Sequence, residues 1–338
     1  MLRQVGAVTF ALLSCGPPLA ADESFYRGKS ITVQVGSGAG GSYDVYARTL
    51  ANYMGRHIPG NPKFVVKIAG GVGGGIATAI QMEHSAPKDG LTIGIVQQTN
   101  VTSQILEAEV AGKYDVTKWA WVGNMAPLRN FLGIWHTSPT QTIEDALHRE
   151  VVVGATGRNS PTYTVPAALN QLVGAKYRIV VGYNGTADLN LAMERGEIQA
   201  RGGQWISVVI SAPQYISEMK LRPVVVDGLT RDPLIPDVPT LLELAKSPQE
   251  KAAIRLISAS GQFARAFFLP PGVSSDKVEI LRAAFTATMK DPEFLAEARK
   301  LKMEIEPSDG ATLDKAAKEI ISSPPPAIAL AKKLLDAN

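Results

Sequence analysis

The chain has 338 residues, which is enough for two domains of ordinary size or one large domain. Apolar residues make up 45% of it and charged residues 19%, so a sizeable core is expected and extensive disorder is not. Lys and Arg number 34 against 31 Asp and Glu, a net charge of +3, and no run rich in Lys and Arg occurs. This balance argues against nucleic acid as a partner.

The N-terminal segment has the order of a secretory signal. Arg3 precedes the apolar run 5–13, and the small residues Ala20 and Ala21 come just before Asp22. The apolar run is much shorter than the about 20 residues that span a bilayer. We therefore expect residues 1–21 to be a signal peptide that is cut off, and the mature chain to be soluble and periplasmic.

Cys15, the only cysteine, leaves a second processing route open. The sequence at 12–15, Leu-Leu-Ser-Cys, is similar to a bacterial lipoprotein box, which would leave Cys15 lipidated at the new N-terminus. Ordinary cleavage instead leaves a mature protein without cysteine. That outcome excludes disulfides, thiolate zinc sites and a cysteine nucleophile.

Short β-branched runs alternate with segments of helical spacing along most of the chain. The predicted strands are 31–35, 64–68, 91–96, 151–154, 177–181, 197–201, 223–226 and 266–269. The predicted helices begin with an apolar stripe over 47–54 and end with 276–290, 292–300 and 313–321. The alternation indicates βαβ units with mostly parallel sheets, so we predict an α/β fold.

Two segments look like crossings between lobes. Residues 119–127 join an apolar aromatic run to Pro127, and residues 227–237 form a polar stretch interrupted by prolines. If both are hinges, lobe 1 is discontinuous and consists of 22–124 plus 228–338. Lobe 2 is then 125–227.

A glycine-rich turn follows the first predicted strand. Gly36, Gly38 and Gly41 satisfy the G-x-G-x-x-G dinucleotide pattern, but the next strand, 64–68, ends without the acidic residue that a nucleotide ribose requires. The turn can instead offer backbone N–H groups to an anion at a helix N-terminus. Because Asp44 would repel that anion, we expect its carboxylate to cap the helix or bind loop amides. A second cluster, 70–75, predicts close approach to a ligand or to another backbone.

Signatures of catalysis are missing from the sequence. G-x-S-x-G does not occur, and three S-x-x-K matches lack the companion motifs of penicillin-binding enzymes. The four histidines are scattered without metal-ligand spacing. We therefore predict that the protein is not an enzyme and holds no metal and no cofactor.

Polar loops follow the third to sixth predicted strands, at 97–100, 156–160, 184–188 and 201–204. Ligands of open α/β sheets bind outside the carboxyl ends of the strands, so we expect these loops to face one cleft and bind a small anion. Each loop alone says little, because turns are commonly rich in Asn, Gly and Thr.

Eight short motifs occur in a characteristic order, at 40–44, 47–48, 71–74, 87–90, 183–185, 195–198, 235–240 and 269–273. In this order they resemble the substrate-binding proteins of tripartite tricarboxylate transporters, also called the Bordetella uptake gene family. The resemblance covers essentially the whole mature chain. It implies a bilobal type II periplasmic binding protein fold, in which two α/β lobes enclose a ligand cleft.

The resemblance also implies which residues bind the ligand, a carboxylate held largely by loop amides and hydroxyls. They are Gly41, Ser42, Tyr43, Thr99, Ser160, Gly185, Thr186 and Asp188. Tyr43 stands where most members carry Thr or Ser. Arg201, which we add to the predicted ligand-binding residues, occupies a strand end where many members carry an acidic residue.

The function that the resemblance implies is capture of a small organic acid by hinge closure and delivery to a tripartite tricarboxylate-type membrane permease. The protein would act as a monomer. Two alternatives stay open: a binding protein that feeds a sensor kinase, and an exported enzyme that uses the same cleft.

Overall fold

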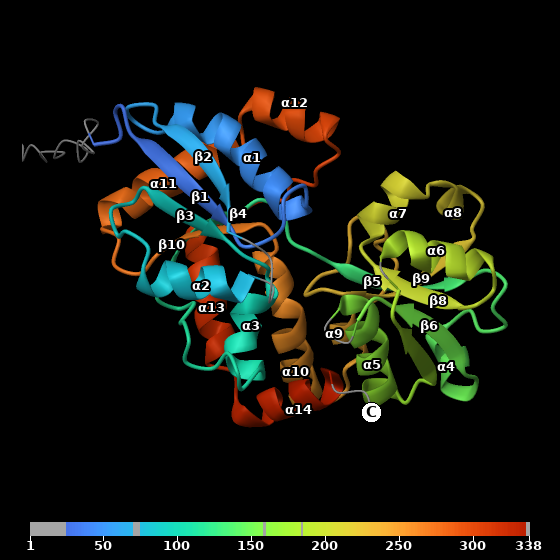
Figure 1. Ribbon diagram of the computed structural model, residues 1–338. Helices are drawn as coiled ribbons and strands as arrows, with labels where there is room; N and C mark the ends of the chain where they lie inside the picture. The colour runs from blue at the N-terminus through green and yellow to red at the C-terminus, as the bar shows by residue number, and fades with distance from the viewer. Residues whose placement is uncertain (1–24, 70–74, 158–159, 184, 336–338) are drawn as a thin grey trace, which may run out of the picture.

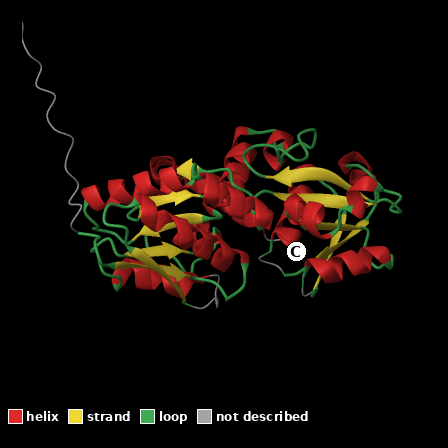
Figure 2. Cartoon of the chain, turned by 90° about the horizontal axis from the view of Figure 1, so that it is seen from above, coloured by secondary structure: helices red, strands yellow, loops and turns green. Residues whose placement is uncertain are grey.

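Two β-sheets, each flanked by helices, lie in separate halves of the molecule, and Figures 1 and 2 show these halves side by side. The computed structural model describes residues 25–69, 75–157, 160–183 and 185–335. The predicted signal peptide, Cys15 and most of the second glycine cluster lie outside the described residues. The α/β bilobal fold is confirmed.

The first sheet has the strand order β11-β4-β10-β3-β1-β2. Its strands are β1 Ser30–Val35, β2 Lys63–Ile68, β3 Thr92–Ile95, β4 Ala120–Asn124, β10 Ala266–Leu269 and β11 Ser308–Asp309. The helices of this half are α1 Ser42–Met54, α2 Ile76–His84, α3 Thr99–Leu106, α11 Ser275–Thr288, α12 Pro292–Lys300 and α13 Gly310–Ile321, with a short 3-10 turn at Gly55–His57.

Alternation of side chains along the strands explains why this sheet is covered on both faces. Trp121 and Phe268 belong to the apolar cluster under α13, whereas Val122 and Phe267 belong to the cluster under α1 and α11. Successive residues of a strand point to opposite faces, so a run without polar residues requires helices on both sides.

The second sheet has the order β7-β6-β8-β5-β9. Its strands are β5 Asn130–Trp135, β6 Val151–Ala155, β7 Tyr177–Val181, β8 Ala200–Gly203 and β9 Leu221–Asp227. The helices of this half are α4 Ile143–His148, α5 Pro161–Val173, α6 Thr186–Glu194, α7 Trp205–Ser211 and α8 Gln214–Ser217.

Three further helices follow the second sheet: α9 Leu241–Leu244, α10 Pro248–Ala259 and, near the C-terminus, α14 Pro325–Leu335. Helix α14 packs on α3 and α10 in one half and on α5 in the other, as Figure 1 shows. One apolar cluster runs from Phe268 through Leu334 of α14 to Leu169 and Val225 of the second half. The two halves therefore share a packed apolar seam under α14.

All eight predicted strands are found, most within one or two residues of their expected ends, while 197–201 is displaced to Ala200–Gly203. Three strands are not among those predicted: β4, which lies within the run 119–127 where a crossing is predicted, β5, which follows that run, and the two-residue β11. The sheets are mixed rather than mostly parallel, because four of the nine strand pairings among the described residues are parallel. Strand β5 enters its sheet directly from β4 of the other half, without a crossover helix, and pairs antiparallel with β8 and β9. Strand β10 returns to the first sheet after α9 and α10 and pairs antiparallel with β3 and β4.

Candidate functional site

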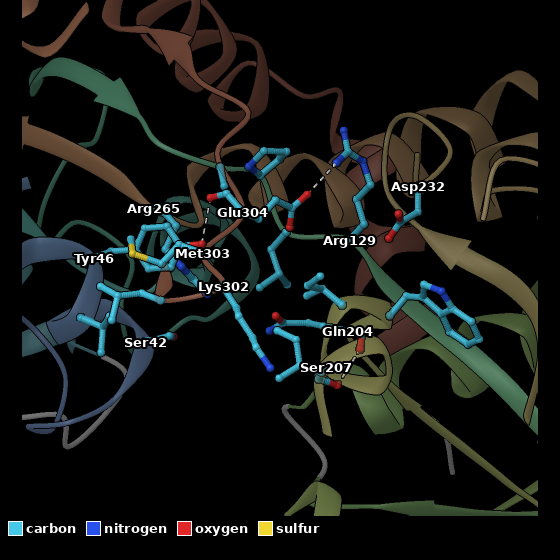
Figure 3. Close-up of a pocket in the computed structure, with 18 of the residues that line it drawn as sticks. Ser42, Tyr46, Arg129, Gln204, Ser207, Asp232, Arg265, Lys302, Met303 and Glu304 are labelled. Atoms are coloured by element: carbon cyan, nitrogen blue, oxygen red, sulfur yellow. Dashed lines mark hydrogen bonds and ion pairs between the residues drawn. The ribbon is translucent and has the colours of Figure 1, made fainter. Parts of the chain in front are cut away.

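A cavity of about 340 Å³ lies between the two halves, and Figure 3 shows it. Its first wall is the start of α1, Arg265 and the turn 301–304, and its opposite wall is the start of α7. Residues 126–129, which connect β4 to β5, form its back, together with Asp232. We call this space the first cavity.

A second cavity, of about 370 Å³, lies on the other side of the connecting segment. It is lined by α3, by the start of α5, by Asp227 at the end of β9 and by parts of α10 and α14. Leu128 lines both cavities. The two cavities therefore flank the chain that joins the lobes.

Arg265, just before β10, is the buried cation of the first cavity. Its guanidinium carbon lies 4.8 Å from the ring centres of both Tyr43 and Tyr46, and Nη1 donates to the carbonyl of Ala264 at 2.8 Å. The residue is 6% exposed, and no carboxylate of the described residues lies within ion-pair distance of it. Its Nε has no hydrogen-bond partner among these residues. A guanidinium held by aromatic faces but lacking a counter-ion is arranged to receive an anion.

Tyr43 joins the two cavities. Its hydroxyl donates to Oε1 of Gln98, which lines the second cavity, while its ring stacks on Arg265 in the first. Burial raises the pKa of the Tyr43 hydroxyl, and the nearby Arg265 charge opposes that shift. The phenol therefore stays neutral and can donate a hydrogen bond at neutral pH.

Arg129, Glu304 and Asp232 add further charges to the first cavity, and each of them contacts a polar group of the protein. Nη2 of Arg129 contacts Oε1 of Glu306 at 2.7 Å, and its Nη1 lies 3.8 Å from a Glu304 oxygen, the contact dashed in Figure 3. Oδ1 of Asp232 accepts the N–H of Leu234 at 2.9 Å. Burial, together with Asp232, raises the pKa of the Glu304 carboxyl.

The start of α1 confirms the role expected for Asp44. The residue is 4% exposed, Oδ2 accepts the N–H of Gly40 at 2.8 Å, and Oδ1 contacts Nε of Arg48 at 2.6 Å. The carboxylate is thus held inside the glycine-rich loop. Gly41 is the N-cap of α1, and Ser42, the first helical residue, lines the first cavity.

The second glycine cluster ends at Gly75, which is described and has φ +89°. A Cβ there would lie 2.6 Å from the carbonyl oxygen of Gly36. Close approach to another backbone is therefore the reason for a glycine at this position.

The other predicted ligand-binding residues are distributed more widely. Thr99 lines the second cavity. Ser160 is the N-cap of α5, where its hydroxyl accepts the N–H of Thr162 and pairs with Thr156. Residues 185–188, which contain Gly185, Thr186 and Asp188, start α6 and line neither cavity.

Arg201 on β8 is fully buried beneath α7 and α8. It is 0% exposed, its guanidinium carbon lies 5.6 Å from the ring centre of Phe131, and it lines neither cavity. Nη1 donates to the Gly202 carbonyl at 3.1 Å, while Nε and Nη2 have no hydrogen-bond partner in the part of the chain that the structure describes. Burial lowers the pKa of Arg201 to about 10.

Sequence reasoning missed Arg265 and Lys302, which line the first cavity. The signal for Arg265 was a cation directly before the apolar strand 266–269. Gln204, which also lines this cavity, belongs to the predicted polar loop 201–204 but is not one of the individually predicted ligand-binding residues.

Asp227, at the lobe junction, gives a pH-dependent prediction. Burial raises the pKa of its carboxyl above the ordinary 3.8, although Ser258 donates to Oδ1 at 2.6 Å. The folded state then holds this proton more tightly than the unfolded state, so its contribution to stability is lost as pH rises through the folded pKa. The melting temperature of Asp227→Asn is expected to be higher than that of wild type at neutral pH, and this difference should shrink toward about pH 4. A difference between Asp227→Asn and wild type that stays constant across this pH range would contradict the prediction.

Within the described part of the chain, no helix combines the length and the apolar composition needed to cross a bilayer.

Comparison with known proteins places the chain in one family. A curated relative from Cupriavidus necator, the UPF0065 protein in the gbd 5′ region, is 24% identical over 307 residues, covering 89% of this chain and 86% of its own. A TctC solute-binding protein from Polaromonas has a similar structure, with a TM-score of 0.69, 19% identity, and coverage of 91% of this chain and 98% of its own. MatC from Rhodopseudomonas palustris, solved with bound malate, has a TM-score of 0.58, 20% identity, and coverage of 91% and 99%.

The family model described as "Tripartite tricarboxylate transporter family receptor" matches residues 47–323, most of the chain. This match confirms the resemblance drawn from the sequence motifs. The chain belongs to the receptors of the tripartite tricarboxylate transporter family.

Proposed function

We propose that this receptor captures a small organic acid between its lobes and that the ligand carboxylate binds at Arg265. The observation that carries the proposal is the buried Arg265 guanidinium, which lines the interlobe cavity without a carboxylate partner among the described residues. An arginine held between two rings keeps a fixed orientation, which suits bidentate binding of a carboxylate. The bound malate of MatC is consistent with this ligand class.

The lobe opposite Arg265 supplies polar groups that a ligand can contact only when the two lobes close around it. Gln204 and Ser207 of the α7 wall face the first cavity, and Ser42 and Lys302 line its other side (Figure 3). A ligand that contacts both walls stabilises the closed form over the open form. Residues 125–227 are proposed as the moving lobe, with the pivot along the seam under α14, because that side is already packed.

The predicted loop residues enter the proposal in different ways. Ser42 and Thr99 line the cavities, Tyr43 lies between them, and Gly41 is the N-cap of α1 next to Ser42; all four are proposed to contact the ligand. Ser160, Gly185, Thr186 and Asp188 would reach it only after closure. Arg201 is proposed to attract the anionic ligand through its positive charge, without contacting it.

The proposal extends to processing and delivery. Residues 1–21 direct export and are removed, unless Cys15 is retained as a lipid anchor. The mature monomer then presents its closed surface to the permease subunits of the transporter and releases the acid chemically unchanged.

A thermal-shift screen tests the function. The mature protein, from residue 22 onward, is melted with mono-, di- and tricarboxylates, aromatic acids and uncharged sugars. A ligand at a hundred times its Kd adds about 2.7 kcal/mol to the free energy of unfolding, so the melting temperature should rise by about 4 °C. Repeating the screen after refolding from denaturant removes any acid that copurified. A rise with sugars but not with acids, or turnover of the bound acid, would contradict the proposal.

A further inference from the structure

Helix α12 ends at Lys300 in a type of turn that usually contains glycine. The N–H of Met303 donates to the carbonyl of Ala298 at 2.8 Å, and the N–H of Lys302 donates to that of Arg299 at 3.1 Å. This pair of bonds is the Schellman motif, whose residue after the C-cap is left-handed and usually Gly. Here the position is Lys302, with φ +54°.

A lysine at such a position stores strain in the backbone. Besides Lys302, the non-glycine residues with positive φ in the described part of the chain are Asn61 and Met219. Of these three residues, Lys302 lines the first cavity. Residues in strained backbone conformations cluster at binding and catalytic sites, which makes the Lys302 side chain a candidate for a ligand contact.

The Lys302 side chain extends into the space between the lobes, with its amine toward the α7 wall that carries Gln204 and Ser207 (Figure 3). Within the described ranges, its Nζ has no ion-pair partner. The carboxylates of the same cavity are otherwise engaged, Glu304 beside Arg129 and Asp232 on a backbone N–H.

Two cations without a carboxylate partner, Arg265 and Lys302, thus line one cavity. Apolar side chains share the walls with them, including Val45, Ile206 and Met303. We propose that Lys302 is the specificity-determining residue of the cavity, whose ammonium binds a second anionic group on the ligand while Arg265 binds the first. This inference rests on the proposed function, and it assigns the receptor to dianions with an apolar body.

The test pairs each dicarboxylate with the monocarboxylate of equal chain length: succinate with butanoate, adipate with hexanoate, suberate with octanoate. Affinities are measured by calorimetry on wild type, Lys302→Met and Lys302→Gly. Wild type is expected to bind at least one dicarboxylate about tenfold or more tightly than its partner. Both variants should lose that advantage and keep the monocarboxylate affinity.

Lys302→Gly separates the ligand contact from the turn. Glycine relieves the left-handed strain, so the unliganded variant should melt about 1–3 °C higher than wild type even though it binds the dicarboxylate more weakly. Met219→Gly is the matched control, because Met219 also has positive φ, is 82% exposed and lines neither cavity. It should gain a similar stability with unchanged binding.

A dicarboxylate advantage that survives in both Lys302 variants would overturn the inference, as would a wild type that binds both acids of every pair equally. Both of these outcomes leave carboxylate binding intact. Absence of binding by every acid would overturn the proposed function as well, so the two failures are distinguishable.

Discussion

Arg265→Met is expected to weaken binding of every carboxylate ligand by about a hundredfold or more, because it removes the buried charge that faces the ligand. The methionine keeps an apolar side chain between Tyr43 and Tyr46, so the wall of the cavity should hold its shape. Titration calorimetry with the best acid from the screen measures the loss.

The fold of Arg265→Met should be intact. The wild-type guanidinium has no carboxylate counter-ion among the described residues, and replacing such a buried charge with an apolar side chain is often neutral or stabilising. Melting of the unliganded variant is therefore expected within a few degrees of wild type or above it, which distinguishes a lost ligand contact from a damaged fold.

Arg56→Met is the matched control. Arg56 also stacks on a tyrosine, with 4.8 Å between its guanidinium carbon and the Tyr53 ring centre, but it pairs with Glu293 and lines neither cavity. Its substitution should leave affinity unchanged. Equal affinity losses for both variants, or none for Arg265→Met, would remove Arg265 from the site.

Gly261→Ala is expected to lower the free energy of unfolding by about 1–3 kcal/mol and to weaken ligand binding. Gly261 lies in the 3-10 turn Ser260–Phe263, and a Cβ there would lie 2.4 Å from the carbonyl oxygen of Leu128. The N–H of Leu128 already donates to the Gly261 carbonyl at 2.9 Å, so neither backbone can move without breaking this contact. Since Leu128 lines both cavities, the displacement changes the shape of each.

Gly157→Ala is the control for this change, because no atom of the described residues lies within 4 Å of the Cβ it would add. Chemical denaturation of the two variants should give a large loss for Gly261→Ala and a change within about 0.5 kcal/mol for Gly157→Ala. Equal stabilities of the two variants would show that Gly261 and Leu128 can move apart at little cost, and would contradict the prediction.

Strand prediction worked where an apolar run stood between polar turns. The runs 177–181 and 266–269 match β7 and β10 residue for residue. It failed at β4 and β5, where five residues separate two strands that belong to different sheets. Periodicity shows that such a run is buried but not which sheet buries it.

The residues that line the two cavities also divide into those that the sequence predicts and those that it does not. Of the residues predicted from the sequence, Ser42 lines the first cavity and Thr99 the second, and the predicted loop 201–204 contributes Gln204 to the first. The sequence did not point to Arg265 or Lys302, because the predicted binding loops all follow strands. Arg265 precedes a strand and Lys302 follows a helix. The roles of Ser160 and Arg201 in binding stay predictions.

The sequence by itself determined the α/β class, the two-lobed plan and the family, since these depend on local periodicity and on short motifs in a fixed order. Only the tertiary structure decided which charges share a cavity. Arg265, Lys302 and Gln204 are separated by dozens of residues in the chain, and they meet because two sheets pack across one seam. Whether a cation lacks a counter-ion depends on every neighbour that the fold brings within about 4 Å, which no local pattern records.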